Sequence, residues 1–131
     1  MATRSRIAVE LPDGKVKSVY CHNNGYLEGV GKDLLSLNFL DSYEVEEFIE
    51  EGDRTTVELS YREWRGEICP PDIHESVSDF FKGDIEEYGY LFTQEGEWLV
   101  KSAYRFPQSP ITLVDALNRE DLAEDLLYIP Y

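Results

Sequence analysis

The spacing of apolar residues near the start of the chain predicts a β-hairpin. Residues 6–11 and 15–21 are β-prone and alternate between apolar and polar side chains, as half-buried strands do. Asp13-Gly14 lies between them, and Asp-Gly is a strong hairpin signal because glycine readily adopts positive φ. One face of this hairpin should carry the apolar side chains Ile7, Val9, Val19 and Cys21.

A second pair of β-prone runs predicts another hairpin. The runs are residues 88–93 and 97–104, and they surround the turn Gln94-Glu95-Gly96. Alternation places large side chains on one face of each strand: Tyr88, Tyr90 and Phe92 on the first, Trp98 and Val100 on the second.

Residues 41–51 have the periodicity of an amphipathic helix. Asp41 or Ser42 can cap its start, and Gly52 can end it. At about 100° per residue, one side consists of Val45, Phe48 and Ile49. The opposite half carries Glu44, Glu46, Glu47, Glu50 and Glu51. From Asp41 to Asp53 the sequence has seven acids and no base.

The segments between these elements are less regular. A glycine-rich stretch, residues 22–31, predicts a loop that leads into a helix over residues 32–39. Residues 55–61 predict a further strand, paired within the sheet. Residues 63–83 look irregular, with a helical turn around residues 76–81.

The tail predicts two short helices. Thr112 and Asp115 form a variant of the capping box at the first of them. One continuous helix would scatter the leucines around its axis, so we expect a break near Asn118. After that break, one stripe would hold Leu122, Ala123, Leu126 and Leu127, and Pro130 would prevent further extension.

Together these elements predict an α+β fold: a small antiparallel sheet built from two hairpins, with short helices packed on it. A chain of 131 residues has the usual length of one domain, so we expect residues 1–131 to form a single domain. Hydrophobic residues make up 42% of the chain and aromatic residues 13%, which is enough to fill a core.

The charge of the chain narrows the choice of partners. There are 27 Asp and Glu against 12 Lys and Arg, which gives a net charge of −15 at pH 7. Such a charge repels nucleic acid and anionic membrane surfaces and attracts basic proteins. We therefore expect a basic protein as partner, with no direct binding to nucleic acid or to a membrane.

The sequence has no sign of export. No apolar N-terminal segment resembles a signal peptide, and no run approaches the roughly 18 apolar residues of a membrane span. Cys21 and Cys69 are too few for a disulfide framework. We expect a soluble protein in a reducing cytoplasm.

Cys21 and His22 are the first candidates for a nucleophile or a metal site, with Cys69 and His74 as further ligands. Neighbours in a regular strand point to opposite faces, so Cys21 and His22 converge only at a bulge or a strand end. The four residues match no specific zinc spacing. We therefore expect Cys21 in the core, and neither a metal nor a cofactor.

The glycine-rich loop and the many carboxylates also fall short of a catalytic motif. Residues 23–31 lack the Gly-Lys-Ser/Thr ending of a P-loop, and Asp33 follows Gly31-Lys32. General acid–base catalysis needs two carboxyls in different environments, whereas these acids cluster at predicted solvent-facing positions. The sequence favours a binding role over an enzymatic one.

One motif of the chain is distinctive: Tyr20-Cys21-His22-Asn23-Asn24-Gly25-Tyr26, followed by Gly29-Val30-Gly31. It resembles a family of small uncharacterised bacteriophage proteins, which open with a similar hairpin and carry a Tyr-Cys-His-x-Asp-Gly-Tyr-Pro pattern. Residues 88–100 are also similar to their C-terminal portion. This chain differs at Asn24, where the pattern has Asp, and at Leu27, where it has Pro. The resemblance implies a viral origin and hence a location in the host cytoplasm.

The acidic helix and the resemblance lead to one expectation about function. We expect an accessory protein that binds a basic host protein, such as a nucleic-acid-binding or defence protein, and inhibits or redirects it. Helix residues three or four apart are neighbours, and DNA presents its charges about every 3.4 Å along a strand, so rows of glutamates could mimic phosphates. The expected contacts are Glu44, Glu46, Glu47, Glu50 and Glu51, supported by Glu120, Asp121, Glu124 and Asp125.

Two alternatives stay open. A small nucleotide-like ligand could bind the loop after the first hairpin together with nearby aromatic residues. The candidates for that site are Tyr20, Cys21, His22, Asn24, Tyr26 and Trp98. A Cys-dependent enzyme could instead be centred on Cys21 or Cys69.

Overall fold

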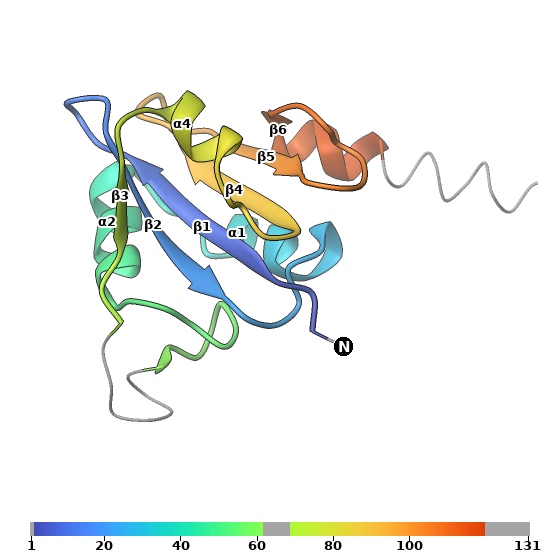
Figure 1. Ribbon diagram of the computed structural model, residues 1–131, viewed down its shortest axis with the longest axis horizontal. Helices are drawn as coiled ribbons and strands as arrows, with labels where there is room; N and C mark the ends of the chain where they lie inside the picture. The colour runs from blue at the N-terminus through green and yellow to red at the C-terminus, as the bar shows by residue number, and fades with distance from the viewer. Residues whose placement is uncertain (1, 62–68, 120–131) are drawn as a thin grey trace, which may run out of the picture.

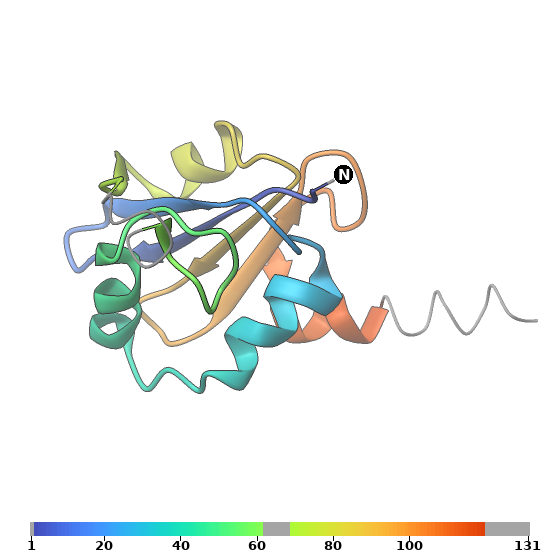
Figure 2. The same cartoon turned by 90° about the horizontal axis from the view of Figure 1, so that it is seen from below.

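The computed structural model describes residues 2–61 and 69–119, which form an α+β fold as predicted. The sheet has six strands in the order β3-β2-β1-β4-β5-β6. Short helices cover both of its faces: α2, α1 and a helix over residues 113–119 lie on one side, and α4 lies on the other (Figures 1 and 2). No helix in the described part of the chain is long and apolar enough to cross a membrane.

Both predicted hairpins are confirmed. β1 (Ser5–Glu10) pairs antiparallel with β2 (Val16–Cys21), and β4 (Tyr88–Phe92) pairs antiparallel with β5 (Trp98–Ser102). Gly14 has a φ of 88°, in the left-handed region that a tight turn needs and that glycine adopts without strain.

The sheet is mixed rather than antiparallel, which corrects the prediction. β1 and β4 run parallel, with Ile7 opposite Tyr90, so the two hairpins meet along their first strands. A parallel pair needs a long crossover connection, and here the chain supplies it between the end of β2 and the start of β4. Alternation fixes the register inside each hairpin but does not say which strands of the two hairpins will meet.

Two short strands complete the edges of the sheet. β3 (Asp72–His74) pairs with β2, and β6 (Ile111–Thr112) pairs with β5. Neither was predicted, because strands of three and two residues are too short to show alternation.

The predicted loop over residues 22–31 is wrong in its second half. A single π-helical turn, η1 (Leu27–Gly31), runs directly into α1 (Lys32–Ser36), which is shorter than predicted. Gly29 lets the backbone of η1 pass close to Asn24 and does not break the chain, because a Cβ there would collide with the carbonyl oxygen of Asn24. That carbonyl accepts a hydrogen bond from the Val30 amide, 2.7 Å away.

The acidic helix is confirmed as α2 (Ser42–Glu50). The side chain of Asp41 caps it by accepting a hydrogen bond from the Glu44 amide, and Gly52 follows with a φ of 85°. Its apolar side is buried against the sheet, as predicted for Val45, Phe48 and Ile49.

Residues 55–61 do not form the predicted strand. They fold as a loop around the side chain of Arg54, which is only 3% exposed. The guanidinium donates hydrogen bonds to the carbonyls of Thr56 and Val57 and lies 4.1 Å from the centre of the Phe48 ring. The buried cation draws carbonyl oxygens toward itself, and those oxygens are then not available for a strand ladder.

The remaining helices agree only in part with the prediction. The turn around residues 76–81 is confirmed as α4 (Val77–Lys82), capped by Ser76. Thr112 accepts a hydrogen bond from the Asp115 amide, as expected for a cap, and the helix that follows is described over residues 113–119. The predicted break near Asn118 stays a prediction, because the chain from residue 120 on lies outside the described residues. The second acidic cluster and the predicted second tail helix lie outside the described residues.

The sheet separates a large core from a small one. The large core holds the predicted inner faces of both hairpins together with the buried sides of η1, α1 and α2. The small core packs α4 against the opposite face, and its buried residues are Ala8, Val16, Phe80, Phe81, Ile85 and Leu91.

Candidate functional site

The predicted glutamates of α2 divide into two sets. Glu46 and Glu50 face Lys17 on β2: its Nζ lies 2.8 Å from Oε2 of Glu46 and also contacts Oε1 of Glu50. Hydrogen bonding to Glu46, and then to Glu50, raises the pKa of the Lys17 ammonium. These two carboxylates therefore stabilise the packing of α2 on β2, and one base offsets part of their charge.

The other three glutamates, Glu44, Glu47 and Glu51, line a groove of about 700 Å³ together with Glu58. Glu44 accepts a hydrogen bond from the Leu40 amide at 2.5 Å, so its carboxylate is fixed at the start of the helix. Within the described ranges, no ion pair involves Glu47 or Glu58. Among the described residues, only Glu51 of this set has a base within ion-pair distance.

The floor of the groove is apolar. It is formed by Leu37, Phe39, Phe48 and Val57. The Phe39 ring packs edge-on against the Phe48 ring at 5.6 Å and lies 6.2 Å from the ring of Trp98 in the core below. Leu37 is 47% exposed and leaves apolar surface beside the carboxylates.

In the described part of the chain, one base lines the groove, Arg54. Nη1 of Arg54 lies 3.9 Å from Oε2 of Glu51, but the guanidinium is buried beside the Phe48 ring. The described lining holds four carboxylates and one buried guanidinium, so this lining is negative. An apolar floor with an acidic rim suits an amphipathic basic segment: the floor can take an apolar side chain while the rim faces Lys or Arg.

The structure does not gather the residues of the small-ligand alternative into one site. Tyr20 and His22 contact each other, with the hydroxyl 2.7 Å from Nδ1 of the imidazole. Tyr26 lies near Tyr88, at one end of the β4–β5 pair. Trp98 is buried in the large core at the other end of that pair. Asn24 occupies a turn with a φ of 61°.

Cys21 and His22 do not share a site. Cys21 is wholly buried in the large core, as predicted, whereas His22 is exposed. Burial is the main cause that raises the pKa of the Cys21 thiol to about 11, so the thiolate is strongly disfavoured. Among the described residues there is no group of His, Cys, Asp and Glu that could hold a metal ion.

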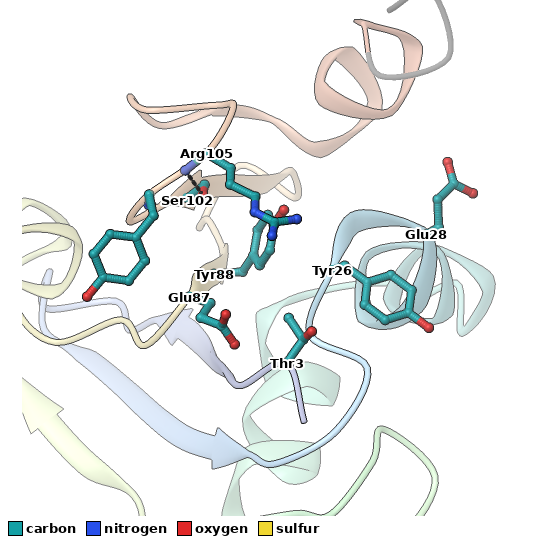
Figure 3. A pocket seen from close by; sticks show the side chains of 8 residues that line it. Thr3, Tyr26, Glu28, Glu87, Tyr88, Ser102 and Arg105 are labelled. Carbon is teal, nitrogen blue, oxygen red and sulfur yellow. Dashed lines mark hydrogen bonds between the residues drawn. The ribbon is translucent and has the colours of Figure 1, made fainter. Parts of the chain in front are cut away.

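Tyr26 lines a different pocket, of about 360 Å³, at the end of the sheet where β4 begins (Figure 3). Arg105 extends toward it beside the ring of Tyr88, and Glu87 and Thr3 lie at its lower side in this view (Figure 3). The Arg105 amide donates a hydrogen bond of 2.8 Å to the buried Ser102 hydroxyl, which holds the base of this loop in place.

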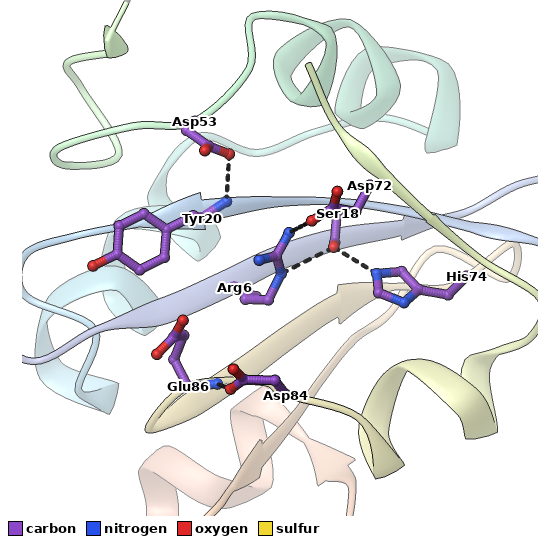
Figure 4. A network of polar contacts seen from close by, with 8 residues as sticks. All are labelled: Arg6, Ser18, Tyr20, Asp53, Asp72, His74, Asp84 and Glu86. Atoms are coloured by element: carbon purple, nitrogen blue, oxygen red, sulfur yellow. Dashed lines mark hydrogen bonds and ion pairs between the residues drawn. The ribbon is translucent and has the colours of Figure 1, made fainter. Parts of the chain in front are cut away.

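A polar network around the buried Ser18, on the α4 side of the sheet, was missed from the sequence (Figure 4). Oγ of Ser18 lies 2.7 Å from Nε2 of His74 and accepts a hydrogen bond from Nε of Arg6, while Arg6 also pairs with Asp72 at 2.6 Å. Burial, followed by the charge of Arg6, lowers the pKa of His74. Ser18 is wholly buried, so the network holds β3 on β2 and offers no accessible nucleophile.

No protein-family model, curated protein or solved structure matches the chain. The resemblance to bacteriophage proteins therefore stays a prediction. The groove residues that sequence reasoning missed are Leu37, Phe39, Arg54, Val57 and Glu58. Val57 and Glu58 had been placed in a strand, and only the proximity of this loop to α2 brings them to the groove.

Proposed function

We propose that the chain is an acidic, phage-type accessory protein that binds a basic host protein through the groove beside α2 and so inhibits or redirects it. One observation supports this most: Glu44, Glu47, Glu51 and Glu58 line the groove together with apolar side chains, and among the described residues no exposed base forms an ion pair with them. A nucleic-acid-binding or defence protein is the expected class of partner, because such proteins carry basic surfaces.

The fold can sustain this concentration of charge. Like charges on neighbouring helix turns cost a few tenths of a kcal/mol per pair. Burial of Val45, Phe48 and Ile49 offsets that cost, at roughly 1.5–3 kcal/mol for each fully buried side chain. The net charge of −15 also steers a basic partner toward the protein at low ionic strength.

The groove favours recognition of a basic polypeptide segment over simple imitation of a phosphate track. Lys17 offsets the row formed by Glu46 and Glu50, so α2 presents one free acidic row instead of two. A phosphate track carries no protruding aliphatic side chain comparable to the exposed Leu37. Nucleic-acid mimicry therefore requires that the partner's basic site also contain an apolar side chain.

Affinity capture from a host lysate tests this proposal. The tagged wild-type chain should retain a basic protein, to be identified by mass spectrometry, and added chain should weaken the nucleic-acid binding of that protein once purified. Retention should fall steeply as salt is raised. Capture that persists unchanged in high salt would contradict an electrostatic mode.

Charge-matched variants distinguish the groove from overall charge. The first carries Glu44→Lys, Glu47→Lys and Glu51→Lys. The control carries Glu75→Lys, Glu95→Lys and Glu97→Lys, three exposed acids outside the groove. Both change the net charge equally, so loss of capture in the first alone supports the groove, and equal loss in both contradicts it.

The Tyr26 pocket favours a narrower form of the small-ligand alternative. Arg105 could face a phosphate while the exposed Tyr26 ring stacks on a base, which is how proteins commonly hold nucleotides (Figure 3). A ligand that binds only the native state raises the melting temperature. A thermal-shift panel of mononucleotides on wild type and Arg105→Gln tests this reading, which fails if no nucleotide shifts the wild type.

A further inference from the structure

A second groove, of about 530 Å³, lies between α4 and residues 108–110. Its apolar lining comes from Val77, Phe81 and Pro110, and two bases, Lys82 and Lys101, border it. Its described lining includes no carboxylate, whereas two glutamates, Glu28 and Glu87, line the Tyr26 pocket and four line the groove beside α2. The described lining of this groove is therefore positive, although the chain as a whole has a net charge of −15.

Lys101 is fixed in place. Its Nζ donates a hydrogen bond of 3.0 Å to the carbonyl oxygen of Phe81, near the C-terminal end of α4. An ammonium has three donors, so two remain for a further acceptor. Lys82 lies in the last turn of the same helix. Within the described ranges neither lysine forms an ion pair, although Arg6, Lys17 and Lys32 do.

We propose that this groove binds a medium-chain fatty carboxylate. The carboxylate head accepts hydrogen bonds from Lys82 and Lys101, and the alkyl chain lies along Val77, Phe81 and Pro110. Charge-assisted hydrogen bonds satisfy the head, and the apolar lining removes the chain from water. The volume lies within the range of roughly 300–1,000 Å³ typical of small-molecule sites.

The overall charge of the protein selects for this ligand among anions. A nucleotide or a polyphosphate carries several charges, all repelled by the acidic surplus, and needs more polar partners than two lysines provide. A fatty carboxylate carries one charge and gains its affinity from the alkyl chain. The site is independent of the proposed function of the groove beside α2, since the two grooves share no lining residue.

A titration of the ¹⁵N-labelled full chain followed by NMR tests the proposal. Hexanoate, octanoate and decanoate are added below their micellar concentrations. We expect saturable shifts of the Lys82, Lys101 and Ser109 amides, with affinity rising about two- to fourfold for each added methylene. Octan-1-ol, which has the same chain length as octanoate but no charge, should bind several-fold more weakly than octanoate.

Three variants separate a specific site from general apolar adsorption. Lys82→Gln, at an exposed position, should weaken octanoate binding about two- to fivefold and leave octan-1-ol binding unchanged. Ser78→Glu puts a like charge in the lining and should weaken octanoate at least as much. Lys15→Gln, in the first hairpin turn, is the control and should change nothing. Shifts that do not saturate, that lie elsewhere, or that are equal for acid and alcohol would overturn the proposal.

Discussion

The Nζ atom of Lys17 on β2 lies 2.8 Å from Oε2 of Glu46 on α2. The same ammonium contacts Glu50, so a single base from the sheet holds two successive turns of the acidic helix. This contact determines which glutamates can meet a partner. Those that face Lys17 stabilise the packing of the helix, and those on the other side border the groove.

Replacing Lys17 by Gln should lower the free energy of unfolding by about 0.5–1 kcal/mol, because a partly exposed ion pair is lost and two carboxylates are left facing each other. Urea unfolding at pH 7 measures this, with Lys15→Gln as the control. An unchanged midpoint would contradict the role given to Lys17.

The pH dependence of the same contact has a definite sign. The folded-state pKa of Lys17 lies above its ordinary value of 10.5, so its stabilising effect is complete below pH 10.5 and is lost as the pH rises through the raised pKa. The stability difference between wild type and Lys17→Gln should therefore shrink in strongly alkaline buffer. If the stability difference between the two chains instead grew in alkaline buffer, the stabilising role given to the Lys17 ammonium would be wrong.

Arg54 should be far more costly to change. Arg54→Met leaves the carbonyl of Val57 buried without its donor and removes the contact with the Phe48 ring, so we expect a loss of about 2–4 kcal/mol. Arg54→Lys should recover little, because an ammonium cannot reproduce the forked geometry of a guanidinium. Urea unfolding of both variants checks this, and a loss below about 1 kcal/mol would show that the loop holds its shape without the cation.

Thiol labelling tests the enzymatic alternative. A pKa of about 11 and complete burial should make Cys21 inert to iodoacetamide in the native state, while the half-buried Cys69 reacts. In the Cys69→Ser variant, labelling should appear only after denaturation, as followed by mass spectrometry. Rapid labelling of Cys21 at neutral pH would revive a Cys-dependent reaction.

His74 should make the protein sensitive to mild acid. Its folded-state pKa lies below the ordinary 6.5, so the unfolded chain takes up the proton first and stability falls as the pH drops below about 6.5. A His74→Gln variant should lose this component, and thermal melts of both chains between pH 5 and 8 compare them. Parallel pH profiles would exclude His74 as the cause.

The parts of the fold that could be predicted are those that local sequence patterns determine. Alternation and an Asp-Gly turn placed β1 and β2, and one polar face with a capping Asp41 placed α2 within a residue. These features depend on neighbours in sequence. The parallel pairing of β1 with β4 depends on which strands of two complete hairpins meet, and no local pattern encodes that choice.

Only part of the candidate site could be predicted from the sequence. The acidic face of α2 followed from helical periodicity. However, Lys17 is 29 positions from Glu46, so the division of that face could not be anticipated. Arg54 also misled the prediction: residues 55–61 have β-forming side chains, but the loop carbonyls bind the buried guanidinium instead. A local contact between a side chain and the backbone overrode β propensity.

The most direct test of the groove is the dissociation constant of the purified host partner, measured by calorimetry for wild type and for the two charge-matched triple variants. The account predicts that Glu44→Lys, Glu47→Lys and Glu51→Lys together weaken binding by about a hundredfold or more, since each lost contact with a cation is worth about 1 kcal/mol or more in a partly desolvated groove. Glu75→Lys, Glu95→Lys and Glu97→Lys together should weaken it less than about fivefold at physiological salt. Equal losses in the two triple variants would contradict the account, because overall charge and not the groove would then determine binding.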